Sequence, residues 1–353
     1  MSEDLDDVLA DALVSEELTR AERQAGRYRR EAADLKARVR RLEAQVDEAE
    51  RVRDLALGVS EHEPAEPFAA PEGNGPRPRI VAALCCSDWH VNECVSLEST
   101  NGANEYSPDI AMRRADRLWQ GFAWYVDLLA TRQDLVGLWI PIIGDMLDME
   151  IHVDGSRSNG LSPMEAVGHC LDCIAPGVRM LAKEFPGAPI VIHTQRGNHG
   201  RIDRRVPAAK VNEYSTEYVL YQWLARELRG VAEVHVGKAG TTYAEVLGHT
   251  VRLHHGDAFG YGGGVGGIQV PAKRWHMRAQ RTREAAFSLV GHWHTYDPGS
   301  DVLINGSLKG PDAYSNFREL GNEPPRQAAF AIDAQRGRVF DRPIYVGEHG
   351  ERR

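Results

Sequence analysis

The sequence predicts an α/β domain with largely buried sheets, preceded by a helical arm. Short apolar runs typical of buried strands alternate with longer stretches at helical spacing after residue 79, and this alternation predicts the α/β domain. A regular heptad pattern over residues 14–49 predicts the arm. Polar clusters directly after five of the apolar runs predict where a functional site would lie.

The arm is expected over residues 1–60. Small and apolar residues alternate there at spacings of four and three, from Val14 and Leu18 to Val46 and Ala49, with Arg and Glu at the flanking positions. So narrow a stripe suits a partner helix better than a globular core, and we therefore expect self-association through a coiled coil. A single solvated helix, or one packed on its own domain, would give the same pattern.

Residues 61–79 are rich in Pro, Glu, Gly and Ala without periodicity, which predicts a linker. The main domain is expected over residues 80–353. Its apolar runs predict strands at 79–86, 135–143, 188–194, 249–255 and 286–291. Helical spacing between them predicts helices at 109–130, 163–185 and 215–229.

Composition narrows the class of protein. The chain has 353 residues, of which 42% are hydrophobic, as is usual for a globular protein. We find no apolar run long enough to cross a membrane and no signal-peptide pattern, so we expect a cytoplasmic protein. The net charge of −9 does not exclude a nucleic-acid partner, because residues 1–76 hold 19 acidic and 11 basic side chains while the rest is nearly balanced.

Polar clusters follow all five expected strands. Ligand sites of open α/β sheets lie just beyond the carboxyl ends of the strands, so these clusters are candidates for one site. In chain order they are Asp88-Trp89-His90, Gly144-Asp145-Met146-Leu147-Asp148, Gly197-Asn198-His199-Gly200, His255-Gly256-Asp257 and Gly291-His292-Trp293-His294. Carboxylate, amide and imidazole donors together suit Mn, Fe or Zn. Two such ions clamp a phosphate and activate a water, and a carboxylate such as Asp145 has two oxygens with which to bridge them.

The order DxH, GDxxD, GNH, HG and GHxH resembles the calcineurin-like metallophosphoesterases, a superfamily of nucleases, phosphodiesterases and protein phosphatases. The similarity spans about residues 80–310. It implies a two-sheet α/β sandwich flanked by helices. It also implies two bound divalent ions, for which we expect manganese in preference to iron or zinc. The resemblance further implies that Asp145 bridges the two ions and that His199 stabilises the phosphate or protonates the leaving oxygen. The other implied ligands are Asp88, His90 and His294 for the first ion and Asn198, His255 and His292 for the second.

Two positions leave roles open. The superfamily usually has Asp or Glu after the GNH histidine, where this chain has Gly200, so the orientation of His199 is in question unless an acid such as Asp203 substitutes. His254 precedes His255, and neighbours on a strand point to opposite faces, so only one of them can be a ligand. We choose His255, because it directly precedes the glycine of the HG motif.

Basic residues near the clusters suggest the substrate. Arg201 follows the GNH motif, and the stretch 273–283 holds five bases around Trp275, among them Lys273, Arg274 and Arg278. Phosphate contacts beside an aromatic ring are typical of nucleic-acid binding, although a solvated helix face would look the same. The segments 104–109 and 309–314 are further candidates for lining the substrate cleft, although plain connecting loops would look the same.

These features favour a metal-dependent phosphodiesterase that cleaves nucleic acid by attack of a metal-activated hydroxide. The inserts around the motifs are similar to those of phage and prophage metallophosphoesterases. As a nuclease, the protein would be similar to SbcD-like enzymes, and some nucleases of this family use a partner ATPase. The alternatives are a phosphomonoesterase or protein phosphatase at the same site, or a coiled-coil adaptor whose phosphoesterase domain only binds.

Overall fold

The structure is a computed structural model that describes residues 77–149, 159–203, 212–260, 267–319 and 321–347, with the single residues 36, 38, 39 and 210. The chain divides into two compact units, Met1–His62 and Glu63–Arg353. In the first unit, Lys36, Arg38 and Val39 are helical. The rest of the predicted coiled coil and most of the predicted linker lie outside the described residues, so both stay predictions.

The second unit is built on two mixed sheets. The first has the strand order β11-β10-β1-β2-β3-β4, with β1 to β4 parallel and β10 and β11 antiparallel at one edge. Its strands are β1 (Arg79–Leu84), β2 (Asp134–Ile142), β3 (Ile190–Thr194), β4 (Glu233–Val236), β10 (Arg326–Asp333) and β11 (Gly337–Tyr345). The second has the order β5-β6-β7-β9-β8, in which β6, β7 and β9 are parallel. Its strands are β5 (Thr242–Val246), β6 (His249–Leu253), β7 (Phe287–Val290), β8 (Asp297–Pro298) and β9 (Val302–Ile304).

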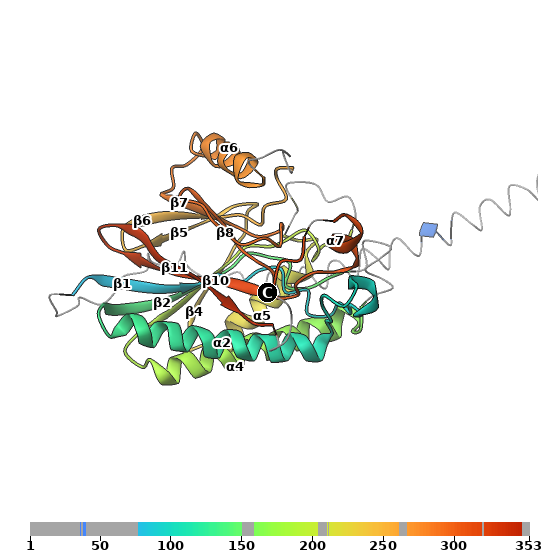
Figure 1. Ribbon diagram of the computed structural model, residues 1–353, viewed down its shortest axis with the longest axis horizontal. Coiled ribbons are helices and arrows are strands. Elements are labelled where there is room, and N and C mark those ends of the chain that lie inside the picture. Colours follow the sequence, from blue (N-terminus) through green and yellow to red (C-terminus); the bar gives the residue numbers. More distant parts are fainter. Residues whose placement is uncertain are drawn as a thin grey trace, which may run out of the picture. The chain divides into compact units, whose positions relative to one another are not determined.

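Helices cover the outer face of each sheet (Figure 1). The long helices α2 (Pro108–Ala130) and α4 (Pro163–Glu184), with α5 (Thr216–Glu227), pack on the six-stranded sheet, and α6 (Gln269–Ala279) packs on the five-stranded sheet. The short elements η1 (Glu98–Thr100) and α7 (Ala313–Phe317) contact each other. The prediction of an α/β domain is therefore confirmed, and the described part of it has two sheets between layers of helix.

Strand alternation separates the two main cores. On β1, Ile80 and Leu84 face the helices, whereas Val81 and Ala83 face the second sheet, because successive side chains of a strand point to opposite faces. Phe330 packs edge-on against Trp139 and Phe287 in the core between the sheets, at centroid distances of 6.2 and 6.0 Å. Each such ring pair contributes roughly 0.5–1.5 kcal/mol beyond the area it buries.

The three predicted helices appear within three residues of their expected ends. Ser107 begins α2, accepting a hydrogen bond from the backbone nitrogen of Ile110, and Pro108 follows at the first helical position. Ser162 and Glu165 form a reciprocal capping box that begins α4. These caps fix where the two long helices start on the sheet.

The five cysteines all lie in the described ranges and are free thiols, and Cys170 and Cys173 are buried on α4. Within the described ranges, no helix is both long enough and apolar enough to span a membrane.

Candidate metal centre

The polar clusters meet where parallel strands end. Asp88 and His90 follow β1, Asp145 follows β2, and Asn198 follows β3, so all leave the same edge of the six-stranded sheet. Backbone bonds hold these loops together: the Asp88 nitrogen donates to the Gly144 oxygen at 3.0 Å, and the His90 nitrogen donates to the Asp145 oxygen at 3.1 Å.

The second sheet contributes its histidines through a direct link between the sheets. The Asp88 carboxylate accepts a hydrogen bond from the backbone nitrogen of His292, which follows β7, at 2.9 Å. The Gly291 nitrogen donates to the His255 oxygen at 2.7 Å. Five loops from two sheets therefore converge on one place.

Three groups of side chains present ligand atoms within 4.8 Å of one another: Asp88, His90 and His294; Asp145, His255 and His292; and His90, Asp148 and His199. The first and second groups contain the same residues that the sequence resemblance assigned to the two ions, apart from Asn198. Clusters of this composition are of the kind that bind divalent metal ions. Asp145 falls in one group, so its bridging role stays a prediction.

Buried polar atoms test whether a metal fits. Both ring nitrogens of His90 and the side-chain oxygen of Asn198 are buried without a hydrogen-bond partner among the described residues. Buried polar atoms in folded proteins nearly always have partners, because an unsatisfied one costs about 1–3 kcal/mol. Imidazole nitrogen and amide oxygen are ligands for Mn, Fe and Zn, so the donor set fits a metal, and a bound cation would satisfy the Asn198 oxygen and one ring nitrogen of His90.

The backbone at these positions is strained. Positive φ angles of 44° to 70° occur at five residues of the first two groups: Asp88, His90, Asp145, His292 and His294. The left-handed region is unfavourable for residues with a Cβ and persists where the surroundings enforce it, which happens most often at functional sites. With these backbone angles, side chains from separate loops point toward a common position.

His255 has the stronger geometric claim of the adjacent histidines. Its Nε2 lies 2.8 Å from the Asp145 carboxylate, and its Nδ1 lies 2.9 Å from the Ile143 oxygen. Burial opposes protonation, but Asp145 outweighs it and raises the pKa of His255 to about 10, which reports a strongly negative environment. His254 instead accepts from the Gly256 nitrogen at 2.9 Å and packs its ring on Trp275, outside the groups.

The orientation of His199 comes from a residue that sequence analysis left without a role. Its Nδ1 lies 2.9 Å from the carboxylate of Asp148, the second aspartate of GDxxD, and its ring lies edge-on to His90 at 4.8 Å. Burial lowers the pKa of His199, but Asp145 and Asp148 outweigh burial and raise it. Asp203, which we considered as a substitute, is exposed. The spacing of GDxxD was the signal that could have identified Asp148.

Glu217, in the first turn of α5, was missed because it lies in no motif. It is fully buried, and its two carboxylate oxygens accept from the Met146 and Gly197 nitrogens, both at 2.6 Å. Burial raises the pKa of Glu217 to about 7, and the neighbouring Asp145 carboxylate adds to the rise. No periodicity or local spacing marks such a residue, since it reaches the site through tertiary packing.

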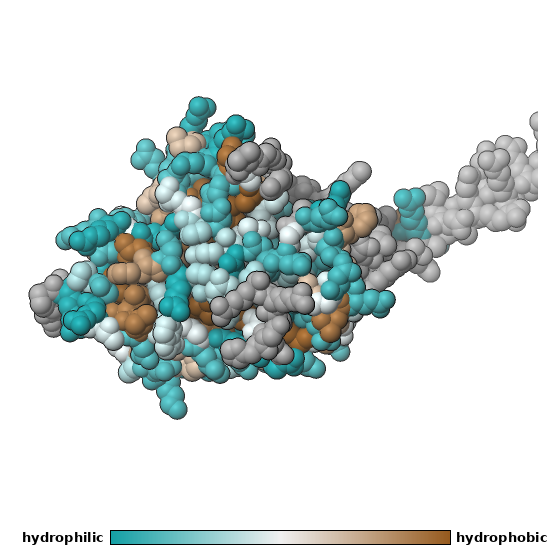
Figure 2. Space-filling model, viewed as in Figure 1, coloured by the Kyte–Doolittle hydropathy of each residue, from teal (hydrophilic) through white to brown (hydrophobic). Residues whose placement is uncertain are grey.

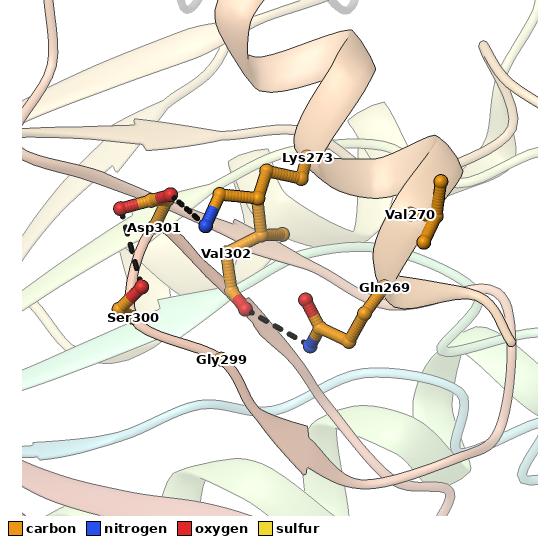
Figure 3. A pocket seen from close by; sticks show the side chains of 7 residues that line it. All are labelled: Gln269, Val270, Lys273, Gly299, Ser300, Asp301 and Val302. Carbon is orange, nitrogen blue, oxygen red and sulfur yellow. Dashed lines mark hydrogen bonds and ion pairs between the residues drawn. The ribbon is translucent and has the colours of Figure 1, made fainter. Parts of the chain in front are cut away.

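The predicted substrate residues lie in two places. Arg201 lies at the candidate metal centre, where its Nε donates a hydrogen bond to the backbone oxygen of Asn198 at 2.7 Å. Arg274 and Arg278 are exposed on α6. Lys273 lies beside a hollow of about 260 Å³ between α6 and the turn before β9, where its amino group pairs with Asp301 at 2.9 Å (Figure 3). None of the metal-group residues lines that hollow.

The aromatic part of the substrate prediction was wrong for Trp275. Its ring is buried against the second sheet, 5.5 Å from Phe259 and 5.1 Å from His254, so it offers no open face to a base. A helix at α6 needs one apolar face for its own core, and Trp275 supplies it.

Comparisons with known proteins add little. No family model matches the sequence, and a search of curated proteins gives no match. Among solved structures, the chain is similar to Vps29 from Entamoeba histolytica, crystallised as a complex with zinc, at 12% identity and a TM-score of 0.29, over 76% of this chain and 100% of that chain. A likeness of this size does not define a fold.

Proposed function

We propose that this protein is a two-metal phosphoesterase of the calcineurin-like type that hydrolyses phosphodiester bonds, with nucleic acid as the substrate. The observation that carries the proposal is the convergence of His/Asp groups at the strand ends, with the buried donor atoms of His90 and Asn198 left without partners in the described structure. The order of the five motifs in the sequence supports the same conclusion independently.

Each group has a distinct task under this proposal. Asp88, His90 and His294 would hold one ion, and Asp145, His255 and His292 with Asn198 would hold the other. When bound, two divalent ions neutralise charge on the phosphate and lower the pKa of a water at the site. His199, fixed through Nδ1 by Asp148, donates a proton from its other ring nitrogen to the leaving oxygen.

Two surface features support nucleic acid as the substrate. On α6, Arg274 and Arg278 are exposed and make no ion pair within the described structure, and Figure 2 shows mostly hydrophilic side chains over this helix. Ring contacts from Trp275 through Phe259 to Trp293 connect α6 to the loop of His292. Unpaired arginines of this kind bind a phosphate backbone.

The second feature is a pair of exposed aromatic rings on α7. Tyr314 is 62% exposed and Phe317 is 81% exposed. Asp312, the N-cap residue of this helix, forms an ion pair with Lys309 at 2.6 Å. Ser307 precedes Lys309 and donates a hydrogen bond to the backbone oxygen of Asp88 at 3.0 Å. Aromatic faces beside a phosphate site are suited to stacking on unpaired bases.

The test is a substrate panel. Metal-free protein is supplied with Mn²⁺ and offered bis(p-nitrophenyl) phosphate, p-nitrophenyl phosphate, and single- and double-stranded DNA. We expect cleavage of the diester and of DNA, abolished by Asp145→Asn. Cleavage of the monoester alone would favour the phosphomonoesterase alternative. No cleavage and no bound metal would contradict the enzyme assignment and leave the adaptor alternative.

The same panel tests the arginines. Arg274→Ala and Arg278→Ala should each reduce the salt dependence of DNA binding, by about 0.7–0.9 in the slope of log affinity against log salt for each lost contact. Hydrolysis of the small diester should not change. Arg336→Ala, which removes an equal charge from the β10–β11 turn, is the matched control. Equal effects of all three would show that only net charge matters. Self-association through residues 1–60 stays a prediction, and the sequence does not show whether a partner ATPase is required.

A further inference from the structure

Glu217 joins the two loops that carry Asp145 and Asn198. Its carboxylate accepts from the Met146 nitrogen, one residue after Asp145, and from the Gly197 nitrogen, one residue before Asn198. Both bonds are 2.6 Å long, and the side chain is fully buried. A buried carboxylate is costly unless its oxygens are satisfied, so this one is stable only while both loops stay in place.

The two loops also pack directly against each other, beside the hydrogen bond from the His199 nitrogen to the Asp145 carboxylate at 2.8 Å. A Cβ on Gly144 would lie 2.2 Å from the Gly197 nitrogen, and a Cβ on Gly197 would lie 2.0 Å from the Asp145 carboxylate. The backbones therefore touch, and their relative position is sensitive to whatever holds their peptide nitrogens. Among the described residues, Glu217 is the side chain that bonds to both.

Gly200 makes room for this arrangement. A Cβ there would lie 2.5 Å from Cγ and 3.0 Å from Cδ of Glu217, so a side chain at position 200 and the side chain of Glu217 would occupy the same space. The Thr216 nitrogen also donates to the Gly200 oxygen at 2.8 Å, which sets α5 against the GNH loop. An acid at position 200 would place its carboxylate close to where that of Glu217 lies.

We propose that Glu217 is a positioning residue that fixes the Asp145 and Asn198 loops for metal binding, and that it supplies from α5 the carboxylate that position 200 lacks. Gly200 and Glu217 are then an exchangeable pair. This inference rests on the proposed function, because the loops that Glu217 holds are those of the metal centre.

The first variant is Glu217→Gln, which keeps size and shape. An amide has one acceptor oxygen, so its NH2 group would face one of the two peptide nitrogens, donor against donor. Loss of a partner behind the ligands costs about 10–100-fold in metal affinity or activity, and we expect a loss in that range for Mn²⁺ binding measured by calorimetry. We also expect a lower kcat with little change in KM. Glu227→Gln, on the exposed side of the same helix, is the matched control and should bind Mn²⁺ like the wild type.

The decisive variant is the exchange. Glu217→Ala should weaken Mn²⁺ binding, and Gly200→Glu alone should also do so by crowding Glu217. The double variant Gly200→Glu/Glu217→Ala should recover most of the affinity, because the new carboxylate enters the space that the old one leaves. Thermal unfolding of each metal-free variant separates a folding defect from a binding defect.

The outcomes are distinct. Wild-type Mn²⁺ affinity in Glu217→Gln would overturn the positioning role while leaving the proposed function intact. A double variant no better than Glu217→Ala would overturn the exchange. If Glu217→Ala does not fold, the comparison of Glu217→Gln with Glu227→Gln still decides the positioning role. Absence of Mn²⁺ binding by the wild type would overturn the proposed function itself, and this inference with it.

Discussion

The pairing of Asp148 with His199 assigns separate tasks to the two aspartates of one motif. Asp145 lies in the ligand group with His255 and His292, whereas Asp148 holds Nδ1 of His199 at 2.9 Å. A carboxylate at one ring nitrogen fixes the tautomer and leaves the other nitrogen to transfer a proton. Under the proposed function, His199 would act as an acid only while Asp148 orients it.

This arrangement predicts an effect that depends on the leaving group. His199→Gln should lower kcat by about 10²–10⁴-fold for a diester with an alkoxide leaving group, because such an oxygen needs a proton as it departs. The loss should be much smaller for a p-nitrophenyl leaving group, which departs as a stable anion. Steady-state kinetics on both substrates measures the difference.

Asp148→Asn should reproduce part of this pattern, because Asp148 holds Nδ1 of His199. Equal losses on both substrates in His199→Gln would show that His199 acts by some means other than protonating the leaving oxygen.

The buried histidine His193 makes the free energy of unfolding depend on pH. His193 on β3 is buried, accepts from the Trp139 ring nitrogen at 3.1 Å and stacks on His235 at 4.4 Å, while Glu233 lies 3.3 Å from His235. Burial, with a smaller effect of His235, lowers the pKa of His193 to about 3. The unfolded chain then binds more protons between about pH 6.5 and 3, so stability is lost as pH falls through this window.

Urea unfolding from pH 7 to 4 tests this. His193 should contribute a slope of up to about 1.4 kcal/mol per pH unit. His193→Asn keeps an acceptor for Trp139 without the titrating ring, and its stability should fall less steeply than that of the wild type. Parallel curves for the two proteins would rule out His193 as the source.

At the scale of elements, contact between α2 and α4 supports the outer face of the six-stranded sheet. The Trp119 ring on α2 lies on Gly177 of α4, where a Cβ would be 2.2 Å from the ring, and its Nε1 donates to the Cys173 oxygen at 2.8 Å. Close approach at this point requires glycine, although glycine weakens a helix interior by about 1 kcal/mol relative to alanine.

Two alanine substitutions on α4 should therefore have opposite signs. Gly177→Ala should lower the free energy of unfolding by about 1–3 kcal/mol through overpacking against Trp119. Gly168→Ala, where no atom lies within 4 Å of the added Cβ, should raise it by up to about 1 kcal/mol through helix propensity. Chemical unfolding of both variants provides the comparison, and stabilisation by Gly177→Ala would refute the packing argument.

The elements were more predictable than the contacts between them. Buried strands such as β2 and β3 are mostly apolar, and α2 and α4 have Ser-Pro starts, so local pattern located them. Strands β4, β5, β8 and β9 escaped prediction because they are two to five residues long. Strands β10 and β11 are eight and nine residues long and escaped because small and charged residues interrupt their apolar positions. The burial of Trp275 was equally hidden, because a basic helix gives no local sign of which face packs on a sheet.

At the scale of the whole molecule, the fold class followed from the alternation of strand-like and helix-like stretches. The meeting of the five motifs followed from their placement at strand ends. Parallel strands bring their carboxyl ends to one edge of a sheet, so Asp88, Asp145 and Asn198 could be grouped from the sequence. The link from the Asp88 carboxylate to the His292 nitrogen joins the two sheets, and it could not be predicted because it depends on how the sheets pack together. So did Glu217, whose role depends on where α5 packs.

The central claim is that two neighbouring groups of side chains each bind a metal ion. Calorimetric titration of the metal-free protein with Mn²⁺ tests it most directly. Two ions per chain should bind to the wild type. His90→Ala should remove one of them and His255→Ala the other, because these histidines belong to different groups. No Mn²⁺ binding by the wild type, or two ions still bound by both variants, would contradict the claim.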